Sequence, residues 1–391
     1  MSRFTPTYAT STRREARVQP ITAAPRDGLD PDTVVRLLRD APAVTIGKGL
    51  ELITTDLQVI EDISTDLAGG SVSRNSYATL HGTCQLSLSR ALTWPSALVR
   101  PYMTISDGTD SARFRLGAFY TSAPVHKTGE SPPTWDVAGY DILHGLHSPT
   151  GEAYAVDAGV SYLAEVEAIL QAQGYTRYVI DQTRADAVLP SAKVWPLDDS
   201  TRWLTVVNEL LAAIGYQGIW SDWDGQLRCQ PYQRPSERAP EWLYDDGRAT
   251  SMMNPTRDLE RDLWEAPNRW VFVRQNDVDG PPPIEGAGIY TWTNNGLGDT
   301  SVEARGRVLT KVSYVDAADQ QALEALAQVT IDADMRIPTT LRMATSPNPL
   351  HWHFDRLVVD EPAVGPYADV MATNWTLPLD GGDMTHEWST L

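Results

Sequence analysis

The sequence predicts a β-rich α+β fold, and three observations support this prediction. Apolar and polar residues alternate along 83–89 and again along 113–118, which is typical of half-buried antiparallel strands. The 391 residues include 27 Gly and 27 Pro, which suits many short strands joined by turns. A helical period dominates only the middle of the chain. The order is therefore β, then α+β, then β with one helix, unlike the βαβ alternation of a nucleotide-binding fold.

The first predicted segment, 1–40, is an N-terminal arm rich in Ser, Thr, Pro and Arg. One short helix is expected in it, because Asp30 is a typical N-cap and Pro31 suits the first helical position. The apolar side of this helix consists of Val34, Leu37 and Leu38. We expect the arm to extend or swap onto a neighbouring molecule, or to be partly disordered.

The second segment, 41–140, is predicted to be all-β. Turn signals rich in Gly, Ser, Asp and Pro separate its strand patterns at 68–71, 106–109 and 129–133. Because each strand pattern has one apolar and one polar side, we expect antiparallel strands with one side facing water.

The third segment, 141–250, has helical periodicity and is predicted to be α+β. Its first helix ends at Gly174, and its second begins at Ser200 as N-cap and ends at Gly215. Residues 163–181 and 204–222 share seven identities in 19 positions. This similarity indicates either a duplicated helix–strand unit or chance, because a helix that stops at Gly and leads into a strand is common.

The fourth segment, 251–391, follows a Pro-rich connection at 230–240 and returns to strand patterns. The predicted strands cover 269–274, 307–314 and 353–359. One helix, capped by Asp316 and stopped by Pro338, is expected between them. Its apolar residues are Leu323, Leu326, Ala327 and Ile331. The C-terminal residues 375–388 are predicted to form a hairpin that turns at Asp-Gly-Gly.

The charge balance excludes several classes of function. Asp plus Glu number 51 and Lys plus Arg number 32, so the net charge is −19. This balance argues against a surface that coats DNA or binds anionic membranes, since both need a positive field. No run approaches the ~18 apolar residues of a membrane span, and the N-terminus has no secretory signal, so we expect a protein made and kept in a reducing cytoplasm unless it leaves by another route.

Aromatic residues are unusually distributed, with 13 Trp and 15 Tyr but only 5 Phe. Trp and Tyr combine a large apolar body with a polar group, which favours half-wet surfaces and interfaces. The alternative is that they fill the faces of β-sheets. Both interpretations stay open for any single residue.

Catalytic signatures are scarce. The sequence has no Walker-type loop, no Gly-x-Ser-x-Gly and no Cys-x-x-Cys, and we expect no enzymatic activity, no cofactor and no catalytic or metal-binding residues. The one weak metal candidate is His351-x-His353-x-Asp355, because side chains two apart on a strand point to the same side. The alternative is that these are polar residues on the wet side of an edge strand.

Two further features have structural interpretations. Asp222-Trp223-Asp224-Gly225 starts like a calcium loop, but a bidentate Glu is missing at the required distance, so a hairpin turn is the better interpretation. Cys84 and Cys229 lie in strand patterns and are expected to be small buried apolar residues, and two cysteines so far apart exclude a disulfide scaffold.

Several strand phrases together resemble a known family. These phrases are GGSVSRNSYATLHGTCQLSLSR at 69–90, LVRPYMTISDG at 98–108, FRLGAFYTSAP at 114–124, WSDWDG at 220–225, RCQPY at 228–232, NRWVFV at 268–273 and the hairpin around Trp375 and Met384. Over about residues 45–391 the pattern resembles the minor tail proteins of actinobacterial, Streptomyces-type siphophages that act as the baseplate hub.

The resemblance implies a structural role in the virion. Such hubs are homotrimers that carry two tube-like antiparallel β-barrel domains per subunit, here placed at 41–140 and 251–391 with 141–250 inserted between them. It implies contacts with the distal tail protein, the tape measure protein and tip or fibre proteins. It also implies a channel through which DNA passes without specific binding, no membrane insertion, and assembly in the bacterial host cytoplasm.

Two other functions stay open at this point. In a carbohydrate-binding receptor module of the tail tip, exposed Trp220 and Trp223 would stack on sugar rings. In a cell-wall hydrolase, acidic residues of the middle segment would line a cleft.

Overall fold

The computed structural model describes residues 30–91, 98–129, 133–198, 200–233, 237–245, 253–261, 264, 266–274, 284–296, 300–315, 320, 323–324, 327, 330–331, 334, 339–361 and 365–391. Contacts divide the chain into two compact units. Unit 1 comprises Met1–Asp258, Arg342–Ser389 and Leu391, and unit 2 comprises Leu259–Leu341 and Thr390.

The largest sheet has 15 strands in the described part of the chain. Their bounds are β1 Thr45–Ile53, β2 Val59–Asp62, β3 Leu67–Asn75, β4 Gly82–Leu88, β5 Leu98–Ser106, β6 Ser111–Arg115, β7 Phe119–Thr121, β8 Val125–Lys127, β9 Thr134–Asp141, β15 Trp242–Asp245, β16 Met253–Arg261, β21 Thr339–Thr345, β22 Arg356–Glu361, β23 Gly365–Pro378 and β24 Met384–Thr390. The main path runs β16-β21-β24-β23-β3-β4-β9-β7-β5-β1-β2.

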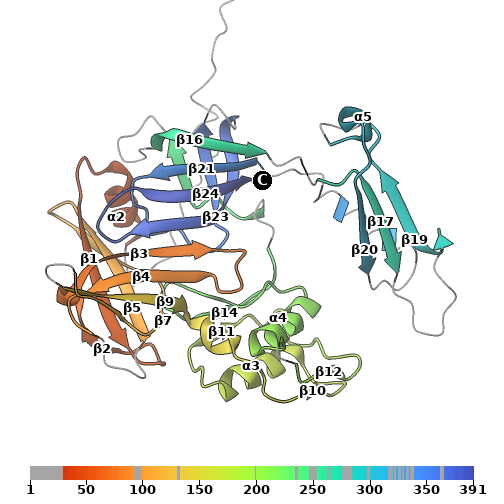
Figure 1. Ribbon diagram of the computed structural model, residues 1–391, viewed down its shortest axis with the longest axis horizontal. Coiled ribbons are helices and arrows are strands. Elements are labelled where there is room, and N and C mark those ends of the chain that lie inside the picture. The colour runs from red at the N-terminus through yellow and green to blue at the C-terminus, as the bar shows by residue number, and fades with distance from the viewer. Residues whose placement is uncertain are drawn as a thin grey trace, which may run out of the picture. The chain divides into compact units, whose positions relative to one another are not determined.

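Alternating side chains explain which side of these strands is buried. In β4 every second residue from Gly82 to Leu88 is buried, as the sequence predicts for 83–89. Strand β23 pairs antiparallel with β3, with Trp375 opposite Arg74, so segments far apart in the sequence share one sheet (Figure 1). The predicted β-rich α+β fold is confirmed. The assignment of separate barrels at 41–140 and 251–391 stays a prediction.

The short helix predicted in the arm is confirmed. Helix α2, Pro31–Val35, has Asp30 as N-cap, with the Asp30 side chain accepting a 2.9 Å hydrogen bond from Thr33 N. It continues as η1, Arg36–Asp40, whose Arg36 pairs with Asp107 and Asp110 in the turn between β5 and β6. The buried residues of these two turns are Val34, Leu37 and Leu38. Residues 1–29 of the predicted arm lie outside the described residues.

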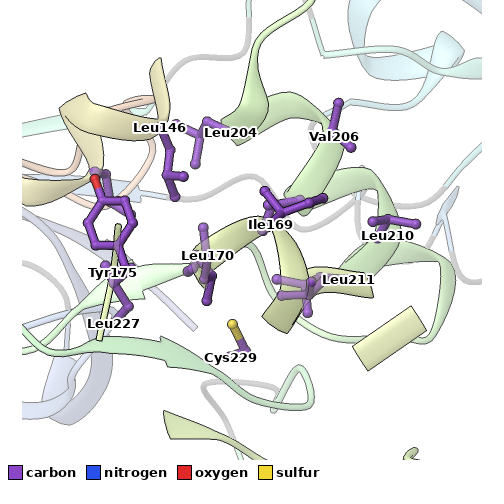
Figure 2. Packing of buried hydrophobic residues seen from close by; sticks show 14 of the residues in the cluster. Leu146, Ile169, Leu170, Tyr175, Leu204, Val206, Leu210, Leu211, Leu227 and Cys229 are labelled. Carbon is purple, nitrogen blue, oxygen red and sulfur yellow. The ribbon is translucent and has the colours of Figure 1, made fainter. Parts of the chain in front are cut away.

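The middle segment packs two helices against short strands. Helix α3 is Tyr162–Ala172 and helix α4 is Trp203–Ala213. The other elements are η3 Ile142–His147, β10 Tyr154–Val156, β11 Tyr178–Ile180, β12 Lys193–Trp195, β13 Trp220–Ser221 and β14 Leu227–Cys229. Figure 2 shows Ile169 and Leu170 of α3 packed among Leu204, Leu210 and Leu211 of α4. This arrangement forms the apolar core of the segment.

The ends of these helices test the sequence prediction. Both helices are followed by the predicted glycines, Gly174 and Gly215, with φ of 81° and 76°, which suits a residue without Cβ. The predicted N-cap Ser200 is wrong, because Arg202 occupies the N-cap position of α4 and makes no side-chain capping bond. Strand β11, which follows α3, pairs parallel with β14, whereas β13, which follows α4, pairs antiparallel with β14. The two helix–strand pairs therefore differ in how their strands pair in the sheet.

Unit 2 contains a smaller sheet in the order β18-β19-β17-β20. Its elements are β17 Arg269–Arg274, β18 Ile284–Glu285, β19 Gly288–Thr293, β20 Thr310–Val315 and the short helix α5 Val302–Arg305. The described residues between 320 and 334 are helical, and Leu323, Ala327 and Ile331 are buried, as predicted. Asp316, Leu326 and Pro338 of that prediction lie outside the described residues.

The C-terminal hairpin is confirmed as β23 and β24, which turn through Asp380 and Gly381. The strand predicted at 353–359 begins later, because Phe354 has φ of 54° and β22 starts at Arg356. Among the helices of the described residues, none is long and apolar enough to cross a membrane.

Candidate functional site

A buried polar junction joins three segments of unit 1. We define the junction as Arg74 of β3, Asp141 at the end of β9, Ser221 of β13 and Trp352 from the C-terminal segment. Arg74 is 3% exposed, and its guanidinium carbon lies 4.3 Å from the centroid of the Trp352 ring. Its Nη2 donates a 3.1 Å hydrogen bond to the Ser221 carbonyl. The Arg74 guanidinium therefore contacts Ser221 of the middle segment and Trp352 of the C-terminal segment.

Ser221 is the shared partner in this junction. Its carbonyl also accepts a 2.8 Å hydrogen bond from Trp352 Nε1, and its hydroxyl donates to Asp141 Oδ2 at 2.8 Å. The other oxygen of Asp141 accepts from Leu143 N at 3.0 Å, so this carboxylate also caps η3. The junction thus fixes the middle segment to the large sheet through hydrogen bonds as well as apolar packing.

Burial sets the electrostatics of the junction. It lowers the pKa of Arg74 to about 10, opposed by the charges of Asp141, Asp355 and Asp222, so the guanidinium stays protonated at neutral pH. Burial also raises the pKa of Asp141, opposed by Arg74, whose Nη1 lies 3.8 Å from Asp141 Oδ2. Arg74 and Asp141 therefore form a buried ion pair, and removing either partner would leave the other charge buried without its counter-ion.

Two histidines lie beside the junction. The rings of His81 and His353 are 4.6 Å apart, and Trp220 stacks on His353 at 5.3 Å with an interplanar angle of 11°. Within the described residues, Nδ1 of both histidines is buried without a hydrogen-bond partner. Burial and the neighbouring Arg74 lower the pKa of His81 to about 3 and that of His353 well below its usual value. Both imidazoles are therefore neutral at physiological pH.

The structure places His351 and Asp355 of the weak metal candidate together and separates His353 from them. His351 Nε2 lies 2.5 Å from the Tyr244 hydroxyl and its Nδ1 lies 3.7 Å from Asp355 Oδ2, whereas His353 faces His81. The interpretation as a wet strand is wrong, because all three are less than 7% exposed and precede β22. Among the residues that the structure describes, no three His, Cys, Asp or Glu side chains gather as metal ligands.

The turn at Asp222–Gly225 is the predicted hairpin, and it contacts the second segment, 41–140. Gly117 N donates to the Trp223 carbonyl at 2.8 Å, and Arg115 Nη1 lies 2.9 Å from Asp224 Oδ1. Gly225 has φ of 90°, and a Cβ there would lie 2.4 Å from the Ala118 Cβ. Only glycine fits this close approach.

A second buried ion-pair cluster lies in the second segment, 41–140. Glu51 of β1 is 3% exposed and receives Arg100 Nη2 at 2.7 Å and Arg113 Nη1 at 3.3 Å. Arg113 also lies over the Tyr102 ring at 4.2 Å. The cluster neutralises a carboxylate that would be costly to bury alone, so its role is structural.

A hollow of about 380 Å³ lies against the large sheet. Its lining residues are Asp258, Arg342, Met343, Ala344, Asn374, Trp375, Thr376, Thr385, His386 and Glu387. Arg342 and Glu387 form an ion pair at 3.3 Å across it. The hollow belongs to β16, β21, β23 and β24, not to the middle segment where a hydrolase cleft was considered.

The residues proposed to stack on sugars are not exposed. Trp220 and Trp223 are both half-buried, with Trp220 against His353 and Trp223 edge-on to Trp352 at 6.5 Å. The junction itself was not predicted from the sequence. Its one visible signal is that Arg74 falls on the same inward phase of β3 as buried Val72, since a charged residue at a core position implies a buried partner.

Two solved tail proteins share this architecture over almost their whole length. A tail protein from Neisseria meningitidis MC58 matches with a TM-score of 0.60 at 12% identity, covering 88% of this chain and 96% of that one. The 43 kDa tail protein of prophage MuSo2 from Shewanella oneidensis matches with a TM-score of 0.61 at 11% identity, covering 89% and 98%. The structural neighbours of this chain are phage tail proteins and a VgrG complex.

The VgrG likeness comes from the half-lidded PdpA–VgrG complex of Francisella, with a TM-score of 0.56 at 9% identity, covering 92% of this chain and 60% of that one. No protein-family model and no curated protein sequence matches this chain. At these identities the likenesses show a shared fold.

Proposed function

We propose that this chain is a structural baseplate hub of a phage tail tip. The observation that carries the proposal is the match over nearly the full length of two tail proteins, at TM-scores of 0.60 and 0.61. The described buried polar groups agree with a structural role, because Arg74, Asp141 and Ser221 are used to hold segments together.

In this proposal three copies form a ring that closes the tail tube. One side of the ring contacts the distal tail protein and the tape measure protein, and the other contacts tip or fibre proteins. The protein has no enzymatic role and is assembled into virions in the bacterial host cytoplasm. DNA leaves through the ring without specific binding, and the net charge of −19 supports this part because a negative wall repels phosphate.

Deleting the gene from the phage or prophage that encodes this chain tests the role in assembly. We expect electron microscopy to show tails that lack a closed tip, and we expect the intact gene supplied in trans to restore them. Gold-labelled antibody against a tagged copy should bind only at the tail tip. Normal tips on the deletion particles would contradict the proposal.

The mass of the purified protein tests the trimer separately. Light scattering over a range of concentrations should give three times the 43.1 kDa chain mass. If the protein alone is a monomer, the same measurement with the distal tail protein added should give three copies per complex. A monomer under both conditions would contradict the ring.

A further inference from the structure

The bend that follows β19 in unit 2 contains a residue pair that can react with itself. Asn295 is the one Asn of the sequence that is followed by Gly. The side-chain amide of an Asn lies within reach of the backbone nitrogen of the next residue, and this proximity favours closure of a five-membered ring. Glycine hinders the attack least, because it has no Cβ and its backbone adopts the widest range of conformations.

The structure leaves both reacting groups of this pair accessible. Asn295 and Gly296 are exposed and lie in a bend outside the strands. In the described part of the chain, neither the Asn295 side chain nor the Gly296 N–H makes a hydrogen bond. Among the described residues beyond its chain neighbours, the nearest atom that a Cβ on Gly296 would meet is Glu303 Oε2, at 3.7 Å. The peptide nitrogen is therefore free to turn toward the amide.

We infer that Asn295 is a site of spontaneous deamidation in the folded protein. The Gly296 nitrogen gives its proton to a base from the solvent and attacks Asn295 Cγ. The N–Cγ bond forms and the Cγ–Nδ2 bond breaks, and the amide nitrogen takes up a proton from the solvent and leaves as ammonia. Water then opens the cyclic imide at either carbonyl, which yields aspartate or isoaspartate. No oxidation or reduction takes place.

The flanks of the bend confine the change to the bend itself. Asn294 is 1% exposed, its N–H donates a 2.8 Å hydrogen bond to the Asn268 carbonyl, and its own carbonyl accepts a 2.8 Å hydrogen bond from Val302 N. These bonds hold the end of β19 beside the start of β17. We therefore expect unit 2 to stay folded after the reaction and to carry one additional negative charge in this bend.

A second exposed Asn shows the opposite situation. Asn75 lies at the end of β3, and its Oδ1 accepts a 3.0 Å hydrogen bond from Tyr77 N. The next backbone nitrogen, Ser76 N, donates a 2.8 Å hydrogen bond to the Thr373 carbonyl. Both reacting groups are thus held by other partners. The variant Ser76→Gly would contain a second Asn-Gly pair with equal solvent exposure of the Asn but without the same freedom, so it is a matched control.

Peptide mass spectrometry of the full chain tests the inference. The purified protein is incubated in neutral buffer made with H₂¹⁸O, and circular dichroism verifies that it stays folded. We expect Asn295 to convert to aspartate and isoaspartate that contain solvent ¹⁸O. Gly296→Ala should slow this conversion by about tenfold or more, because its Cβ hinders the attack. In folded Ser76→Gly, Asn75 should convert at no more than about a tenth of the rate at Asn295.

The same variants in guanidinium chloride separate the effect of the fold from that of the sequence. Unfolded Ser76→Gly should convert Asn75 and Asn295 at similar rates, since both pairs are then free. An Asn295 that stays intact in the folded protein while it converts in the unfolded chain would overturn the inference. Equal rates at the two sites of folded Ser76→Gly would also overturn it, because the bend would then have no part in selecting the site. If Ser76→Gly does not fold, the comparison of folded and unfolded wild-type protein decides alone.

Discussion

The Arg74 guanidinium lies over the Trp352 ring, with its carbon 4.3 Å from the indole centroid, although the two residues come from opposite ends of unit 1. The indole covers one side of the cation, and the Ser221 carbonyl accepts hydrogen bonds from both side chains. Removing Arg74 leaves the Asp141 carboxylate buried without its cation, and this dependence underlies the first prediction.

Arg74→Met should lower the free energy of unfolding by about 3–5 kcal/mol, because it leaves the Asp141 carboxylate buried without its cation. Urea unfolding followed by Trp fluorescence measures this. Adding Asp141→Asn should recover part of the loss. The control is Arg90→Met at an exposed ion pair with Asp66, where a change within about 1 kcal/mol is expected. Equal losses for the two arginines would contradict the role of the junction.

Gly225→Ala should destabilise unit 1 more than the same change at Gly159. Both glycines have positive φ, 90° and 84°, so both substitutions carry a backbone cost of about 1–2 kcal/mol. Only at Gly225 does the new Cβ meet another atom, 2.4 Å from Ala118 Cβ, which adds about 1–3 kcal/mol of overpacking. Thermal unfolding of the two variants side by side measures the difference, and identical midpoints would refute the close approach.

The free energy of unfolding should fall as the pH is lowered, because His81 binds a proton more readily in the unfolded chain than in the folded protein. The pKa of His81 is about 3 in the folded protein and 6.5 when exposed, so between these values the unfolded chain binds the extra proton. The loss is about 2 kcal/mol on going from pH 7 to pH 5, at about 1.4 kcal/mol per pKa unit. In urea unfolding at both pH values, His81→Gln should reduce the wild-type slope by this amount, while His353, whose pKa burial also lowers, keeps its own contribution. Substitution of the exposed His144 should retain the full wild-type slope, and that slope in the His81 variant would disprove the assignment.

Both thiols should resist modification in the folded protein. Cys84 and Cys229 are about 1% exposed, and burial raises the pKa of Cys229 to about 12, so the reactive thiolate is nearly absent at pH 8. Ellman's reagent should therefore detect no thiol in native protein and two per chain in guanidinium chloride. Rapid reaction of either thiol without denaturant would contradict the burial.

The sequence correctly predicted those elements that a few neighbouring residues determine. The N-cap at Asp30, the glycines after α3 and α4, the turn at Asp222–Gly225 and strand β17 each follow from a few neighbouring residues. The stretch from His351 to Asp355 was misassigned because its alternation matches a strand. The left-handed conformation of Phe354 breaks that strand, and the pattern of side chains does not reveal it.

The junction depends on contacts that local reasoning does not reach. Arg74, Ser221 and Trp352 have no shared motif, and each becomes informative only when β23 is known to pair with β3. The inward phase of Arg74 predicts a buried partner without saying which of the 51 acidic residues supplies it. The segments with strand patterns carry the resemblance to tail hubs, whereas the distances in the junction are set by the folded chain.

The pairing of β23 with β3 also governs the order of events during translation. Strand β3 leaves the ribosome long before residues 365–378 exist, so its pairing edge stays open while the chain grows. Such a high contact order slows folding and extends the time in which nascent chains can pair wrongly with one another. Chaperone supply and low expression temperature should therefore determine the yield of native protein more than the stability of the finished molecule does.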